Sequence, residues 1–234
     1  MEHLSYMGNI KPLVLSISFV LLHIFASAQD SLKLLDHGFT LRFNIGYVTS
    51  ELYGSYVERL VNANLQGFPM AEKNAGGLET NFLVTARLFK FMSIKSGIGF
   101  TQHGGKIEHS PFVYPIDVKL AYLTIPLGIS LNTTMRKTNL AVDGGVQYAF
   151  EISSSQDFQK GITSSEYKQS NETTIPTYFL GASLLHDING TWGIEFSYRF
   201  VNGLKPFYTQ QYRDQVRELS TRAQSFSVGV IYGL

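Results

Sequence analysis

The sequence predicts an all-β protein: an eight-stranded antiparallel up-and-down transmembrane β-barrel with long loops on one side and short turns on the other. Three observations lead to this fold class. The N-terminus has the pattern of a cleaved export signal, and eight later segments alternate apolar residues with small or polar ones. The connections between these segments alternate strictly between long and short. We therefore expect the chain in a bacterial outer membrane.

The export signal consists of a basic residue, an apolar stretch and a small-x-small cleavage site. Lys11 precedes the apolar residues 12–25, and Ala26-Ser-Ala28 follows them. The stretch is shorter than the ~20 residues that a membrane-spanning helix needs. Cleavage after Ala28 would leave Gln29, which cannot take the lipid anchor of a lipoprotein cysteine. The predicted organisation is a signal peptide over 1–28, a short periplasmic segment over 29–37 and the barrel over 38–234.

Composition sets limits on the class of protein. The chain has 234 residues, a formal net charge of +1, no cysteine, 21 glycines, 17 phenylalanines and 13 tyrosines. Without cysteine there is no disulfide, thiol chemistry or cysteine–zinc site. A balanced charge gives no reason to expect nucleic acid as a partner. Many aromatic residues and glycines with few charges are typical of a membrane barrel, although soluble β-proteins share this composition.

Seven of the eight predicted strands have one apolar face and one small or polar face. In the first, Phe39, Leu41 and Phe43 alternate with Thr40 and Arg42. The fourth keeps its alternation on both sides of a proline, and the sixth is apolar on both faces. The expected strands are 38–48, 78–89, 92–101, 118–131, 140–152, 177–186, 192–200 and 225–234. Their length suits the ~9–11 residues of a tilted transmembrane strand.

The connections favour an up-and-down barrel over a sandwich. The short ones are 90–91, 132–139 and 187–191, the last with the Asn189-Gly190 hairpin signal. The long ones are about 49–77, 102–117, 153–176 and 201–221, and helical spacing of apolar residues predicts a short helix within 51–65. A barrel with both termini on the periplasmic side produces this alternation, whereas Greek-key crossings do not.

Two resemblances support the location. The final segment resembles the C-terminal assembly signal of outer-membrane barrels through Ser227, Gly229, Tyr232 and Leu234, although the usual last residue is aromatic. Most of the mature chain resembles the outer membrane protein β-barrel domain, or PorT-like group, of Bacteroidota. The segments that carry this likeness are 39–46, 97–100, 104–105, Tyr122-Leu-Thr-Ile-Pro126-Leu127 and Leu140–Gly145. The resemblance implies a fold and a location, and no activity transfers with it.

The predicted inward faces carry four basic and four acidic residues. They are Arg42, Glu79, Arg87, Lys95, Asp143, Glu151, Glu195 and Arg199. Because buried charges are costly unless they are paired, the balanced set predicts an internal salt-bridge network that plugs the lumen. A proton or ion path is the functional alternative.

The sequence predicts no catalytic, cofactor-binding or metal-binding residue and hence no enzyme, although a loop-based hydrolase stays open. His103 and His109, six apart in a predicted loop, are the nearest approach to a metal site, and Ser110 beside His109 is the nearest to a nucleophile and base. Known hydrolase and phosphate-loop motifs are missing. Two further alternatives remain: a small pore, and a soluble lipocalin-like barrel whose apolar faces would point inward around an apolar ligand.

The expected partners are outer-membrane lipid, the barrel-assembly machinery during insertion, and a protein or surface partner at the long loops. Aromatic residues in the loops motivate the last of these, because each buries a large area on contact. Packing over the barrel mouth is the other role open to them. They are Tyr53, Tyr56, Phe68, Phe112, Tyr114, Phe158, Tyr167, Phe207, Tyr208 and Tyr212.

Overall fold

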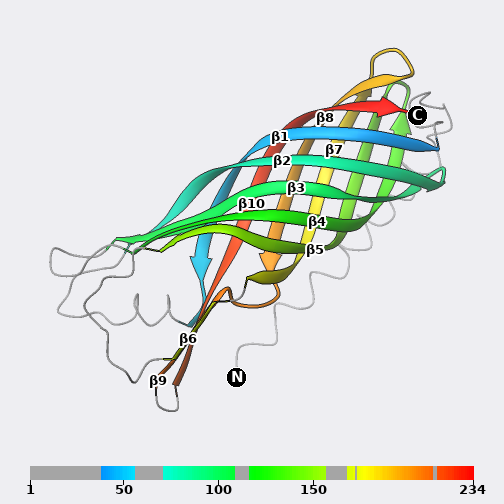
Figure 1. Cartoon of the computed structure of the whole chain (residues 1–234). Helices are drawn as coiled ribbons and strands as arrows, with labels where there is room; N and C mark the ends of the chain where they lie inside the picture. Colours follow the sequence, from blue (N-terminus) through cyan, green and yellow to red (C-terminus); the bar gives the residue numbers. More distant parts are fainter. Residues whose placement is uncertain (1–37, 56–70, 109–115, 157–167, 172, 213–214) are drawn as a thin grey trace, which may run out of the picture.

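The chain folds into a closed antiparallel β-barrel. The computed structural model describes residues 38–55, 71–108, 116–156, 168–171, 173–212 and 215–234. The eight barrel strands are β1 (Phe39–Tyr53), β2 (Ala71–Phe89), β3 (Met92–Glu108), β4 (Ile116–Met135), β5 (Thr138–Gln156), β7 (Thr174–Asp187), β8 (Trp192–Gly203) and β10 (Gln215–Gly233). Each pairs antiparallel with its neighbours in chain order, and β1 pairs with β10 to close the barrel (Figure 1). The predicted fold class is confirmed.

Two further strands lie outside the barrel wall. β9 (Tyr208–Tyr212) forms a hairpin with the beginning of β10, and β6 (Lys168–Asn171) pairs with β9. Together they make a small sheet that continues from β10 beyond the barrel end, at the lower left of Figure 1. The prediction of 201–221 as a loop was therefore wrong over β9 and the first residues of β10.

The strands extend beyond the predicted limits at the end where the long connections lie, here called the long-loop end. β2 begins at Ala71 rather than 78, and β10 begins at Gln215 rather than 225. The reason is physical: outside a lipid belt the outer face no longer has to be apolar, so the alternation that marks a strand disappears while its hydrogen bonds continue. The predicted helix within 51–65 is wrong at its start, because Glu51 and Leu52 belong to β1, and 56–65 lie outside the described residues.

The outer face of the barrel is apolar and its inner face is polar. On β1, Phe43 and Ile45 are about half exposed, at 49% and 51%, whereas Arg42 and Asn44 are each 3% exposed. A lipocalin-like barrel would show the opposite arrangement, so the structure contradicts that alternative. In the part of the chain that the structure describes, no helix has the length and apolar character needed to cross a membrane.

Aromatic residues mark both edges of the apolar belt. The ring centres of Trp192 and Tyr232 lie 4.7 Å apart at the end with the short turns. Those of Tyr198 and Phe226 lie 4.9 Å apart towards the long-loop end. On β1 the belt runs from Phe39 to Tyr47, which is about 27 Å of strand. At a tilt of about 40° this spans about 21 Å, close to the ~25 Å apolar height of outer-membrane barrels.

Pro126 lies inside β4 without ending it. The β3–β4 register runs through Ser96↔Leu127 and resumes at Gly99↔Thr124 in the same alignment. The Ser96 hydroxyl donates to the Pro126 carbonyl at 2.9 Å. The missing N–H of Pro126 therefore falls on the β3 side, where a side chain takes over from the backbone ladder. The β4–β5 register continues without a shift on both sides of Pro126, from Tyr122 to Met135.

Candidate functional site, a polar lumen beneath an apolar cap

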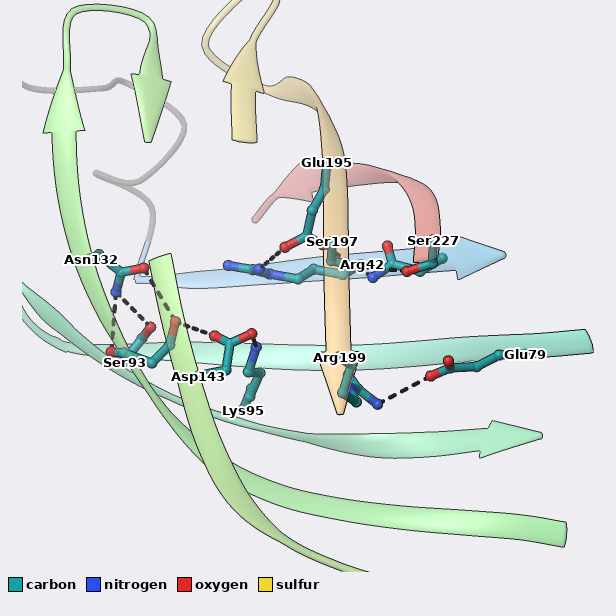
Figure 2. A network of polar contacts seen from close by, with 12 residues as sticks. Arg42, Glu79, Ser93, Lys95, Asn132, Asp143, Glu195, Ser197, Arg199 and Ser227 are labelled. Atoms are coloured by element: carbon teal, nitrogen blue, oxygen red, sulfur yellow. Dashed lines mark hydrogen bonds and ion pairs between the residues drawn. The ribbon is translucent and has the colours of Figure 1, made fainter. Parts of the chain in front are cut away.

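Three ion pairs cross the lumen, and six of the eight charges predicted to face inward form them (Figure 2). Arg42 Nη1 lies 2.6 Å from Glu195 Oε1, and both side chains are 3% exposed. The other two pairs are Lys95 Nζ with Asp143 Oδ2 at 2.5 Å and Arg199 Nη1 with Glu79 Oε1 at 3.2 Å. All six charged groups are nearly removed from solvent, so their pairing is what makes their burial tolerable.

Each carboxylate also accepts a hydrogen bond from a neutral side chain. Asn44 Nδ2 donates to Glu195 Oε2 at 3.1 Å, and Asn81 Nδ2 donates to Glu79 Oε1 at 2.6 Å. The Ser130 hydroxyl donates to Asp143 Oδ1 at 2.7 Å. These bonds use lone pairs that the ion pair leaves open, and they fix the orientation of each carboxylate.

A second polar layer lies nearer the short turns. Asn132 Nδ2 donates to the Ser93 hydroxyl at 3.0 Å, and the Ser130 hydroxyl lies 3.4 Å from Asn132 Oδ1 (Figure 2). Ser130 thereby connects this layer to the Lys95–Asp143 pair. Ser93, Asn132, Ser130, Asp143 and Lys95 are therefore joined in one chain of polar contacts, and the other two ion pairs lie apart from it.

Glycine makes room for the large side chains of this narrow interior. The Arg199 guanidinium lies 5.0 Å from the centre of the Phe179 ring, which itself is 1% exposed. A Cβ added at Gly128 would lie 2.6 Å from Cζ of Phe179, and one at Gly145 would lie 2.9 Å from the same atom. The ring therefore fills space that two facing glycines leave open.

The remaining two predicted charges do not belong to these three pairs. Arg87 lies at a short turn, where its guanidinium donates to the carbonyls of Phe89 at 3.3 Å and Lys90 at 3.2 Å. Glu151 lies opposite Tyr122 near the long-loop end and is half-buried. Alternation along the strands assigned these residues to the inward faces, but it could not place them along the barrel axis.

An apolar cluster, here called the cap, fills the lumen at the long-loop end. Its buried members include Phe207 and Tyr208, which the sequence placed in a loop, and both are at most 3% exposed. The cap comprises Leu52, Val118, Leu120, Tyr122, Ala149, Ile175, Phe207, Tyr208 and Leu219. The sequence pattern did not indicate the cap. The available signal was the predicted sixth segment, 177–186, whose second apolar face supplies Phe179 to the lumen below the cap; Ile175 of the cap lies just before that segment, in a predicted loop.

A small cavity lies beside the Glu79–Arg199 pair. The cavity of about 10 Å³, room for about one water molecule, is lined by Glu79, His103 and Gln147 among others. His103 is buried on β3, with its Nδ1 3.5 Å from the Thr221 hydroxyl, rather than in a solvated loop. His109 lies outside the described residues, among which no group of three potential metal ligands occurs.

The residues of the C-terminal assembly signal lie on the strand that closes the barrel. Ser227 faces inward, with its hydroxyl 2.6 Å from that of Ser197, and Gly229 lies against Asn44 so closely that any side chain would collide. Tyr232 packs beside Trp192, and Leu234 is 60% exposed. The polar and apolar members of the signal thus point to opposite faces of β10.

Solved structures of outer-membrane barrels resemble this fold. OprG of Pseudomonas aeruginosa is 8% identical with a TM-score of 0.50, and the match covers 85% of this chain and 98% of that one. Neisserial surface protein A is 12% identical with a TM-score of 0.45, over 84% and 97% of the two chains. The outer membrane protease OmpT of Escherichia coli is 7% identical with a TM-score of 0.46, over 84% and 96%. No protein-family model and no curated protein matches the chain.

At such low identity the likeness establishes the fold alone. The chain has the architecture of a bacterial outer-membrane β-barrel, and its apolar outer face, polar lumen and aromatic edges agree with the location that the export signal predicts.

Proposed function

We propose that this chain is a non-enzymatic integral outer-membrane barrel with a closed lumen, whose long-loop end contacts a partner outside the cell. The observation that carries the proposal is that three ion pairs lie in the lumen below an apolar cap. Membership of the PorT-like group of Bacteroidota is part of the proposal and rests on the sequence resemblance.

The contents of the lumen argue against a steady pore. Separating a buried ion pair leaves two charges in a medium of low dielectric, and removing one partner of such a pair typically costs ~3–5 kcal/mol. An ion crossing this interior would have to displace the pairs and then the apolar cap, which offers it no polar ligand. An eight-stranded barrel is also just wide enough to be filled by its own side chains.

The outward surface beyond the belt is suited to contact with water or a partner. There Glu51 on β1 forms an ion pair with Arg222 on β10, and the Arg222 guanidinium lies 5.4 Å from the centre of the Tyr53 ring. The barrel wall therefore continues outside the membrane as a polar sheet. Phe207 and Tyr208 are buried, so these two aromatic residues pack inside the barrel and do not contact a partner. The partner surface that we propose therefore consists of the outer wall and the connections above it.

Conductance measurements in planar bilayers test the closed lumen. Wild-type protein should insert and show no steady conductance steps. The comparison is a variant with Arg42→Ser, Glu195→Ser and Phe207→Ala, which lacks one ion pair and part of the cap. Its conductance should show brief, irregular openings. Stable, large steps from the wild-type protein would move the function to transport.

Site-specific photo-crosslinking in whole cells tests the partner surface. A photoreactive residue replaces Leu204, which is 57% exposed at the long-loop end. The matched control replaces Asn189, an exposed residue in a turn at the opposite end. The proposal predicts a captured product at 204 and none at 189. Identical products at both positions, or none at 204 under all growth conditions, would contradict it.

A further inference from the structure

The barrel wall has a break between β2 and β3 just beyond the apolar belt. The β2–β3 ladder stops at Asn74↔Gly105 and resumes at Glu79↔Thr101, so four residues of β2 face three of β3. On the inside, the Ser50 hydroxyl accepts a hydrogen bond from Gly104 N at 2.7 Å and donates to Gly104 O at 2.9 Å. Side chains thus replace the ladder in this stretch.

Gln102 closes the same break from the outside. Its Oε1 accepts a hydrogen bond from the backbone N–H of Leu78 at 3.1 Å. This bond commits the carbonyl end of the side chain to the wall and leaves the Nε2 amide as its remaining donor. The side chain is exposed on the outer surface, so this donor is available to a ligand there.

A cavity of about 250 Å³ opens on the outer wall at this break. A second irregularity, where Ala121 pairs with Ser153 but Tyr122 pairs with Glu151, shapes its far side across β4 and β5. The lining combines polar with apolar groups and comprises Ala75, Gly76, Gln102, His103, Lys119, Leu120, Ala121 and Ser153. Of these residues Gln102, Lys119 and Ser153 are exposed, whereas His103 and Leu120 are buried, so the accessible lining is mainly polar.

Its height on the barrel is that of lipid headgroups. The Tyr47 hydroxyl, at the aromatic edge of the belt, lies against Gly76 in the cavity wall. Immediately towards the membrane follow the outward side chains Leu78 and Leu123, which are each 42% exposed and belong to the belt. A molecule in the cavity can thus place a polar group at its rim and an apolar chain along the belt.

The surroundings of the cavity are rich in lysine. Lys119 lines it and is exposed on β4, opposite Gly104 of β3. Lys106 lies two residues further along β3. It is opposite Lys73 on β2 and opposite Asp117 on β4. Each lysine also has a polar or charged neighbour within the chain, so none is isolated. Three lysines across adjacent strands still make this part of the wall a place where an anionic group is favoured.

We propose that this cavity binds the phosphorylated headgroup of a lipid in the outer leaflet, an inference that rests on the membrane placement given under Proposed function. Lys119 supplies the charge for the phosphate, and the Gln102 amide and the Ser153 hydroxyl supply hydrogen bonds. The acyl chains run along Leu78 and Leu123. A free anion in water would gain nothing from the exposed Leu78 and Leu123 beside the cavity, and this favours a lipid as its source.

The test measures lipid binding by native mass spectrometry of the full mature chain in a neutral detergent. The probes are short-chain phosphatidic acid, phosphatidylcholine with the same chains, and inorganic phosphate as competitor. Wild-type protein should prefer phosphatidic acid, and millimolar phosphate should not displace it. Lys119→Gln should lower the affinity for phosphatidic acid about fivefold, the weight of one lysine near an anionic surface. Lys90→Gln, an exposed lysine at a short turn, should leave it unchanged.

Two outcomes would overturn the inference while leaving the barrel proposal intact. In the first, the protein is folded, because it migrates faster on gels when it has not been heated, but it has equal affinity for the two lipids, or both lysine variants lose the same affinity for phosphatidic acid. In the other, inorganic phosphate displaces the lipid, which would make the site one for a free anion. If wild-type protein migrates at the same rate with and without heating, the membrane barrel itself would be contradicted.

Discussion

Removing the Glu195 carboxylate tests whether the lumen network stabilises the barrel. Glu195→Ala leaves the Arg42 guanidinium, 3% exposed, without its partner at 2.6 Å, and Asn44 loses its acceptor at 3.1 Å. Breaking one side of a buried pair costs ~3–5 kcal/mol of unfolding free energy. The matched control is Arg222→Ala, which breaks the exposed pair with Glu51 and should cost at most ~1 kcal/mol because water screens it.

Urea unfolding in phospholipid vesicles measures both variants. Trp192, the single tryptophan, lies on the outer face of β8 and reports unfolding through its fluorescence. The double variant Arg42→Met with Glu195→Leu should recover most of the loss, because an apolar pair of similar volume leaves no charge buried. If Glu195→Ala costs no more than Arg222→Ala, the lumen pair is solvated and the reasoning from burial is refuted.

Three further substitutions test packing and orientation. Gly128→Ala should cost ~1–3 kcal/mol, because its Cβ meets the Phe179 ring, and Phe179→Leu in the same chain should relieve it; the urea midpoint measures both. Val228→Arg, on the outer face near mid-belt, should lower the free energy of unfolding by ~2–4 kcal/mol. Thr49→Arg, just beyond the belt, should lower it by at most ~1 kcal/mol. Equal losses in the vesicle assay would show that the belt is misplaced. Phe207→Ala in the cap should cost ~3–5 kcal/mol in unfolding experiments without opening the lumen to ions, since the ion pairs below remain.

The barrel itself could be predicted because its pattern is local. A side-chain period of two assigns every residue of a transmembrane strand to a face, so Arg42 and Glu195 could be placed inside and Phe43 outside from the sequence alone. Alternating connection lengths then gave the strand order. This information is lost where the lipid stops, and the strand ends at the long-loop side were accordingly the least accurate part of the prediction.

The partners inside the lumen could not be predicted in the same way. Arg42 pairs with Glu195 across 153 positions of sequence, and the choice depends on strand tilt and register rather than on either residue's neighbours. The cap was missed for a related reason. In the sequence, Phe207 and Tyr208 look like exposed aromatic residues of a loop. Only the pairing of β9 with β10 brings them into the apolar cluster at the barrel mouth.

The ion pairs also determine in what order the wall can open. Arg42 on β1 and Glu195 on β8 stand on either side of β10, so their contact passes across the inside of the last strand, and Glu79 with Arg199 crosses both β1 and β10. Lys95 and Asp143 cross β4 in the same way. As long as β10 stays paired with β8, the seam between β1 and β10 can open only after these two charge contacts separate, which slows unfolding from the seam. None of the three pairs crosses β7, so hydrogen exchange should begin there rather than at the junction of the two ends of the chain.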